Sequence, residues 1–249
     1  MSSLHTANRS PIPILMYHQI EVAASRGGAF RSLYVSPSAF ARQMAWLHFL
    51  GFRALSISAL MPYLRGKRRG KVVGLTFDDG YLNNFTHALP VLLKHDFSAT
   101  CYAVSQHVGK TNSWDRDAGI APAPLMSAAQ LRHWCAAGQE VGAHSRHHPR
   151  LTQLDAARCQ QEISGSKAEL EDMTGSAVQH FCYPYGDYNA DQAVIARAAG
   201  FESATTTQRS RCQTHENIMQ LPRVPVVRST TLPLLWLKVA TGYEDRRRQ

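Results

Sequence analysis

The chain has 249 residues, 44% of them hydrophobic and 18% charged, and its formal net charge is +9. This length and apolar content suit one globular domain with a full core. The sequence has no internal repeat, no low-complexity segment and no run of the roughly 20 apolar residues that a membrane-spanning helix needs, so it excludes a repeat array and a spanning helix.

Strand-like and helix-like segments alternate along the chain. The expected strands are residues 12–17, 52–57, 71–77, 98–104, 140–144, 178–186, 202–207 and 218–224. The expected helices begin at Ser36, before Phe85, at Ser127, near Thr152 and at Asn189, and glycines follow several of them, at Gly51, Gly138, Gly175 and Gly200. Repeated units of this kind predict a parallel sheet. With seven or eight units the prediction is an α/β fold, a distorted (β/α)7-8 barrel, in one domain over 1–249, with a core at about 12–228 and an apolar and basic tail at 229–249.

Two basic clusters, at residues 65–71 and 246–248, contribute to the positive charge. They are either solvated loops or surfaces that attract phosphate groups of a membrane or of a phosphorylated substrate. No zinc-finger, RNA-recognition or basic-heptad signature accompanies them, so nucleic acid is not an expected partner.

The five cysteines are scattered, odd in number and never in C-x-x-C spacing. This usage indicates reduced thiols in a reducing compartment. The first residues, "MSSLHTANRSPIP", lack the apolar centre of a signal peptide. We therefore expect a cytoplasmic location, unless a leader has been removed.

Polar side chains follow several of the expected strands at the point where each strand ends. His18 follows "ILMY", Asp78 and Asp79 follow "GLTF", and His144 follows "EVGA". The carboxyl ends of parallel barrel strands meet at one rim, where barrel enzymes carry their active sites. These side chains are therefore expected to lie together.

A metal site is one use for this rim. His144 and His148 are four residues apart and can reach one point from a single turn. Two neutral imidazoles and one carboxylate leave positions open on a divalent ion, as catalytic sites require. His147, at three residues from His144, is the alternative ligand, although a place beside the site or on the surface suits it better.

At this point the sequence resembles a known family. "TFDDG" at 76–80 and the H-S-x-x-H pattern at 144–148 resemble the first two motifs of the polysaccharide deacetylases, carbohydrate esterase family 4, with a NodB-like domain. The resemblance extends from "ILMYHQIE" to "LPRVPV". The "MYH" opening, "FCYPYGDYN" and the late "PRV" are most similar to the branch that deacetylates bacterial poly-N-acetylglucosamine.

The resemblance implies roles for the motif residues. Asp78 would be the general base, and Asp79, His144 and His148 would bind a divalent metal, usually zinc and sometimes cobalt or nickel. The physics agrees, because an ion beside Asp79 neutralises it and lets Asp78 stay ionised.

The remaining roles depart from the common family pattern. The late Leu-x-His motif that holds the acid histidine in many members is missing, and His215 lies in a polar loop. The resemblance to the branch with "YH" after the first strand implies that His18 serves as the general acid instead, and the alternative is a hydrogen-bonded rim histidine. Tyr183 stands near the place of the usual third-motif arginine, and Arg223 is expected to pair with Asp78 instead. The backbone N–H of Tyr185 is the candidate oxyanion donor.

The sequence thus predicts a metal-dependent hydrolase that removes N-acetyl groups from an N-acetylhexosamine glycan or lipid-linked precursor, as in cell-surface glycan biosynthesis. The alternatives are an amidase for non-sugar amides and a non-catalytic carbohydrate-binding relative. Aromatic side chains near the rim, namely Tyr81, Trp114, Tyr183 and Tyr185, favour a sugar, and Trp114 and Asp115 lie in a loop that either binds it or has no role.

The C-terminal segment allows two interpretations. Residues 232–239 are mostly apolar and include Trp236, and three arginines follow at 246–248. They form either a final helix packed on the barrel, with Pro233 in its first turn, or an interfacial anchor that touches the membrane peripherally.

Overall fold

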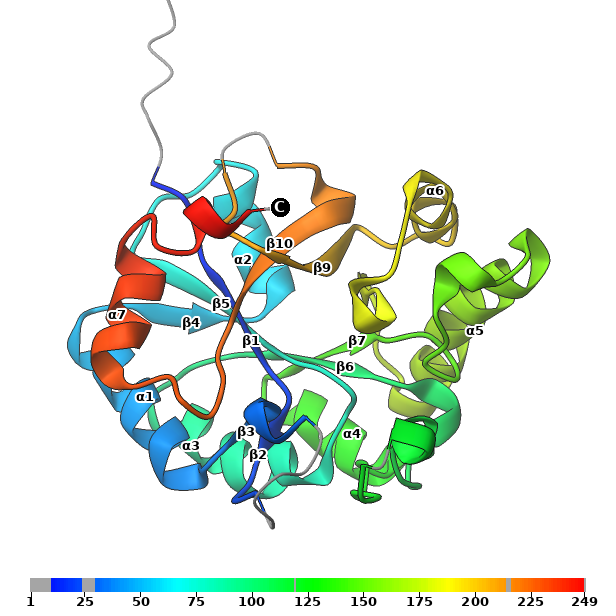
Figure 1. Cartoon of the computed structure of the whole chain (residues 1–249), viewed down its shortest axis with the longest axis horizontal. Helices are drawn as coiled ribbons and strands as arrows, with labels where there is room; N and C mark the ends of the chain where they lie inside the picture. Colours follow the sequence, from blue (N-terminus) through cyan, green and yellow to red (C-terminus); the bar gives the residue numbers. More distant parts are fainter. Residues whose placement is uncertain (1–9, 24–29, 119, 214–215, 249) are drawn as a thin grey trace, which may run out of the picture.

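The computed structural model describes residues 10–23, 30–118, 120–213 and 216–248 (Figure 1). Its strands are β1 Ile14–Tyr17, β2 Gln19–Ile20, β3 Tyr34–Val35, β4 Arg53–Leu55, β5 Val72–Phe77, β6 Thr100–Ala103, β7 Glu140–Ala143, β8 His180–Cys182, β9 Ser203–Arg209 and β10 Leu221–Pro225. Its α-helices are α1 Pro37–Phe49, α2 Ile57–Leu64, α3 Leu89–Lys94, α4 Ala128–Ala136, α5 Ala156–Thr174, α6 Ala190–Ala198 and α7 Leu232–Ala240.

Parallel strands close the central barrel. Within the described residues they follow the order β1-β10-β9-β8-β7-β6-β5. Strand β5 pairs again with β1, so seven strands close the barrel. β4 and β6 share one edge of β5, since Arg53 pairs with Val72 at its start and Thr100 pairs with Thr76 near its end. β4 therefore extends the wall beside β5, and the predicted (β/α) barrel is confirmed with seven closing strands.

Side-chain caps define several helix starts as the sequence predicts. The Ser36 hydroxyl accepts a hydrogen bond from the Ala39 N–H at 3.3 Å, and Ser127 and Gln130 form a capping box at the start of α4. The expected start of the long helix near Thr152 is wrong. Asp155 caps α5 instead, because its carboxylate accepts the Arg158 N–H at 2.8 Å.

Helix α2 was not expected from the sequence. The sequence predicts a strand over 52–57 and no element over 58–64, but β4 ends at Leu55 and Ser56 caps a helix that begins at Ile57. Pro62 lies inside this helix and hides the helical pattern, because proline is rare in helix interiors.

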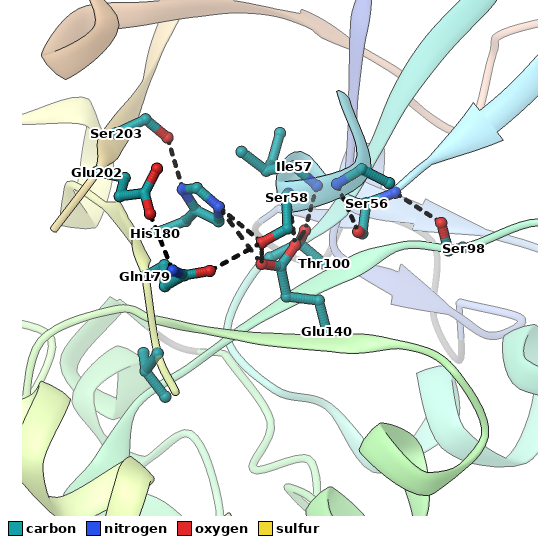
Figure 2. Close-up of polar contacts among 12 residues, drawn as sticks. Ser56, Ile57, Ser58, Ser98, Thr100, Glu140, Gln179, His180, Glu202 and Ser203 are labelled. Carbon is teal, nitrogen blue, oxygen red and sulfur yellow. Dashed lines mark hydrogen bonds and ion pairs between the residues drawn. The ribbon is translucent and has the colours of Figure 1, made fainter. Parts of the chain in front are cut away.

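The first residues of α2 are tied to the amino-terminal end of the barrel (Figure 2). The Ser58 hydroxyl hydrogen bonds Glu140 and lies 2.9 Å from Nε2 of His180. Thr100 donates to Glu140 at 2.6 Å, and Nδ1 of His180 lies 2.8 Å from the Ser203 hydroxyl. Because Thr100, Glu140, His180 and Ser203 begin four neighbouring strands, this polar network covers the end of the barrel opposite the carboxyl-terminal rim.

The C-terminal helix packs on the barrel beside α1 (Figure 1). Leu235 and Val239 belong to the main buried cluster, and the Lys238 ammonium is paired with Glu244. The guanidinium of Arg247 stacks on Tyr243 at 4.5 Å. These contacts are the ones expected of a final helix packed on the barrel, and they give no support to the interfacial anchor.

All five cysteines are free thiols, and four of them are buried. In the part of the chain that the structure describes, no helix has the length and apolar character needed to cross a bilayer.

Candidate active site

The loops that follow the barrel strands line a cavity of about 790 Å³ at the carboxyl-terminal rim. His18 follows β1, Asp78 and Asp79 follow β5, His144 follows β7, and Tyr185 follows β8, and all five line this cavity. The expectation that these side chains share one rim is met.

The backbone is strained at this rim. Asp79, Ser145, His148 and Tyr185 have φ values of 73°, 61°, 61° and 58°, in the left-handed region that side chains disfavour. Each such residue costs about 1–3 kcal/mol and persists only where its surroundings fix it, which is typical of functional sites.

Asp78 is held by a buried arginine from β10. Both guanidinium edge nitrogens of Arg223 donate to the carboxylate, with Nη1 at 2.6 Å from Oδ1 and Nη2 at 2.8 Å from Oδ2. The guanidinium is itself fixed, because its Nε donates to the Thr206 carbonyl at 2.8 Å and Nη1 donates to the Thr76 hydroxyl at 3.2 Å. Burial alone would raise the pKa of Asp78, but Arg223 outweighs it and lowers the pKa below its ordinary value. Asp78 is therefore an ionised, oriented carboxylate.

Asp79 faces the two histidines of the second motif. Its Oδ1 lies 3.5 Å from Nε2 of His144 and 3.4 Å from Nε2 of His148. Nδ1 of His144 lies 2.7 Å from the Cys182 carbonyl oxygen, which only accepts, so the ring nitrogen that faces Asp79 is the one free to bind a ligand. One carboxylate oxygen and two imidazole nitrogens, all buried, thus converge within 4.8 Å of one another. This donor set fits a catalytic divalent metal.

The charge of Asp79 also governs the protonation of its partners. Burial would raise the pKa of Asp79, but hydrogen bonds from His144 and His148 lower it well below its ordinary value. Burial lowers the pKa of His144, but Cys182 and Asp79 outweigh it and raise the pKa well above its ordinary value. Burial keeps the pKa of His148 low. A proton and a divalent ion therefore compete for Nε2 of His144.

His148 is oriented by aromatic rings. The backbone N–H of His148 donates to the Ser145 hydroxyl at 2.9 Å. The buried Nδ1 of its imidazole ring has no hydrogen-bond partner among the described residues. The ring stacks on Trp114, with centroids 4.8 Å apart and planes at 23°, and meets the ring of Tyr185 edge-on at 4.5 Å. Trp114 thus packs one face of its ring on a candidate metal ligand and also lines the cavity, so its role in sugar binding stays a prediction.

This stacking predicts the effect of truncating Trp114. The Trp114→Ala variant is expected to bind zinc about 10- to 100-fold more weakly, the usual cost of losing a group that orients a metal ligand, whereas Trp114→Phe should keep most of the affinity. Zinc affinity is measured by competition with a chromophoric chelator. Trp46→Ala, in α1, is the matched control, since Trp46 stacks on Phe49 away from the cavity. Unchanged zinc affinity in a folded Trp114→Ala protein would contradict the orienting role.

Helix α5 braces the loop that carries the histidines. Glu162 accepts hydrogen bonds from the N–H of Arg146 and of His147, both at 2.9 Å, and also binds Nδ1 of His147 at 2.6 Å. Glu169 pairs with the Arg146 guanidinium at 2.8 Å. His147 is half exposed and is bound by Glu162. It is not part of the candidate metal group of Asp79, His144 and His148.

His18 lies beside the carboxylate of Asp78. Its Nε2 is 3.8 Å from Oδ2 of Asp78, and its carbonyl oxygen accepts a hydrogen bond from the Asn84 side chain at 2.9 Å. The side chain is 17% exposed and so reaches the cavity. Its role as the acid stays a prediction, and the alternative, His215, lies outside the described residues.

The two tyrosines of "YPYG" separate at this rim. Tyr183 is fully buried, stacks on Tyr188 with centroids 4.6 Å apart, and donates its hydroxyl to the Met219 carbonyl at 3.1 Å. Tyr185 is 39% exposed, and burial raises its pKa to about 12. Gly186 makes this turn possible, because a Cβ there would meet the Thr207 hydroxyl at 1.9 Å. Tyr183 is thus a core residue, and Tyr185 is the tyrosine of this motif that substrate can reach.

Several supporting residues were not found from the sequence. Cys182 fixes His144 through its carbonyl, and its Sγ lies 3.2 Å from Arg223. Glu162 and Glu169 brace the histidine loop. The two glutamates are seven residues apart, which is two helical turns and one face of α5, and this spacing is the signal that could have revealed them.

Fold and site together define a (β/α)7 barrel with a buried Asp-His-His group and an arginine-held aspartate at its carboxyl-terminal rim. The family model described as polysaccharide deacetylase matches residues 65–204, more than half of the chain. The chain belongs to the polysaccharide deacetylase family.

Individual relatives agree with this assignment. A Bacillus subtilis protein named for the same family, YxkH, is 28% identical over 225 residues, which cover 90% of this chain and 74% of the relative. The poly-beta-1,6-N-acetyl-D-glucosamine N-deacetylase of Staphylococcus aureus is 23% identical over 229 residues, with 84% and 77% of the two chains covered. The deacetylase PplD of Streptococcus pyogenes, solved in complex with acetate, has a TM-score of 0.81 and 25% identity, and covers 93% of this chain and 99% of its own. IcaB from Ammonifex degensii shares the fold, with a TM-score of 0.76 at 24% identity over 92% of this chain and 96% of its own.

Proposed function

We propose that the protein is a divalent-metal-dependent N-deacetylase that hydrolyses the acetamido group of an N-acetylhexosamine and releases acetate. The observation that carries this proposal is the convergence of Asp79, His144 and His148 beside the arginine-held Asp78. The names of the S. aureus relative and of the acetate-bound neighbour support the same reaction.

The metal would be held by Asp79, His144 and His148, and zinc is the ion that suits this donor set best, with cobalt or nickel as alternatives. When bound, a divalent ion supplies Lewis-acid chemistry, which acidifies water and polarises an amide carbonyl. Asp78 needs this help, because Arg223 keeps it ionised but also makes it a weaker base.

The protein's own groups carry the proton transfers. Asp78 accepts a proton from the attacking water, and His18, whose Nε2 is 3.8 Å from Asp78, gives a proton to the leaving nitrogen. The backbone N–H of Tyr185 donates to the carbonyl oxygen as negative charge develops there. The balance is one amide and one water consumed, and one amine and one acetate formed.

Metal removal tests the proposal directly. Purified protein is expected to contain about one divalent ion per chain, measured by mass spectrometry of the metal. A chelator should abolish acetate release from N-acetylglucosamine oligomers, and zinc or cobalt should restore it. Full activity of metal-free protein would overturn the mechanism. Release of acetate from simple amides but not from sugars would identify an amidase, and sugar binding without acetate release would identify a binding protein.

Loss of His18 is expected to change the pH profile. If Asp78 must be ionised and His18 protonated, the rate is bell-shaped in pH. His18→Ala should flatten the alkaline limb and should slow the release of poor leaving amines most, as measured by acetate release across pH with amides of different amines. Near-normal rates in this variant would contradict the acid role and return it to His215 or to water.

The polymer length and the place of action are further parts of the proposal. The buried free thiols suit a reducing compartment, and such a location suits a lipid-linked precursor of a surface glycan. Comparing acetate release from free, polymeric and lipid-diphosphate-linked N-acetylhexosamines would decide which substrate is used.

A further inference from the structure

Arg150 stands exposed at the cavity and was not assigned a role from the sequence. It follows the candidate ligand His148 by two residues. Its guanidinium lies over the ring of Tyr185, 4.6 Å from the centroid, and that ring also meets the ring of His148 edge-on. One aromatic ring therefore separates the positive charge from a candidate metal ligand.

The charge of Arg150 is uncompensated. Two other arginines of this region are paired with carboxylates, Arg146 with Glu169 and Arg223 with Asp78. Among the side chains that the structure describes, Arg150 has no carboxylate within 4.0 Å. Tyr185 occupies one face of the guanidinium, so the N–H edge remains for a ligand.

Arg150 is the one arginine among the described residues that line the cavity, and none of those residues is a lysine. The carboxylate of Asp78 is already paired with Arg223, and that of Asp79 faces the candidate metal ligands. The Arg150 guanidinium is therefore the group that attracts an anionic substituent. A planar guanidinium binds phosphate or carboxylate through two parallel hydrogen bonds.

We propose that Arg150 forms a subsite for an oxyanion carried by the substrate, so that the preferred substrate is an N-acetylhexosamine with a phosphate or carboxylate near its acetamido group. This inference rests on the proposed deacetylase function and names its substrate class. A sugar phosphate and an acidic sugar share this chemistry, and the test separates them.

The test compares three small substrates that differ in charge. They are methyl N-acetylglucosaminide, which is neutral, N-acetylglucosamine 1-phosphate, and N-acetylmuramic acid, which carries a carboxylate. The readout is the kcat/KM for each anionic sugar divided by that for the neutral one. Arg150→Gln is expected to lower this ratio about three- to thirtyfold, mainly through KM, for whichever anion the subsite accepts. Arg150→Lys should restore part of it, and added salt should lower it in the wild type.

A matched control and a second readout keep the outcomes distinct. Arg158→Gln removes an exposed arginine of α5 that pairs with Asp155, and it should leave the ratio unchanged. An unchanged ratio in Arg150→Gln for both anions would overturn the subsite. If no sugar releases acetate, the deacetylase proposal fails, and calorimetric binding of N-acetylglucosamine 1-phosphate decides the subsite alone. Weaker binding by Arg150→Gln would then support it, and equal binding by both proteins would overturn it.

Discussion

Replacing Asp78 with asparagine is expected to leave the divalent ion bound and to reduce turnover by about 10²- to 10⁴-fold, the usual worth of a general base. The carboxylate of Asp78 faces Arg223, whereas the group that fits a metal is built on Asp79. The amide keeps the size of the side chain but cannot accept the proton. Acetate release and metal content are measured on the same preparation.

Asp79→Asn is the matched comparison, because it changes the neighbouring residue in the same way. It should lose metal affinity along with activity, since Oδ1 of Asp79 faces both histidine nitrogens. If Asp78→Asn loses metal while Asp79→Asn keeps it, the roles of the two carboxylates are reversed.

Replacing Arg223 with methionine is expected to give the largest loss of stability. The change leaves Asp78 as an unpaired charge in the core, and breaking a buried pair in this way costs about 3–5 kcal/mol. For a chain of this length that corresponds to a fall of roughly 6–20 °C in melting temperature. The double variant Asp78→Asn/Arg223→Met should regain part of the loss, because no buried charge remains.

The same change should alter the pH dependence. In the folded wild type the pKa of Asp78 is lowered, so the pair contributes stability above the ordinary carboxyl pKa and loses it as pH falls through the folded value. In Arg223→Met the main opposition to burial is lost and only the smaller effects of His18 and His144 remain, so the pKa of Asp78 should rise. The stability difference between wild type and variant should therefore shrink in acid, and the acid limb of the activity profile should move to higher pH. A melting difference that does not depend on pH would show that Arg223 acts by packing alone.

The sequence predicted the barrel because its strands carry local signals. "VVGLTF" is continuously apolar, and the capped helix starts at Ser36 and Ser127 are short-range patterns. The closing pairing of β1 with β5 could only be inferred from the number of units, because it joins segments far apart in the chain. Helix α2 was missed because Pro62 contradicts a helix locally, and its hydrogen bonds to β6, β7 and β8 appear only in the folded chain.

The candidate site also contains some residues that the sequence predicts and others that only the folded chain reveals. Motif residues such as Asp79 and His144 could be placed from spacing and resemblance. The groups that orient them could not, because stacking of Trp114 on His148 and the hydrogen bond from His144 to the Cys182 carbonyl join separate loops. Tyr183 and Tyr185 show the limit of the sequence most clearly, since two tyrosines two residues apart differ in exposure, one fully buried and the other exposed.

The polar network of Ser58, Glu140 and His180 has a kinetic consequence for the proposed reaction. It covers one end of the barrel, and buried side chains such as Tyr102 and Arg223 fill the interior above it, so the rim is the way in and the way out. Asp79 and His144 are buried, whereas Tyr185 is exposed, so under the proposed function we expect the acetamido group to enter first and the sugar to stay nearer the solvent. Acetate would then form behind the amino sugar and leave after it. We therefore expect ordered product release, with acetate inhibiting in competition with substrate.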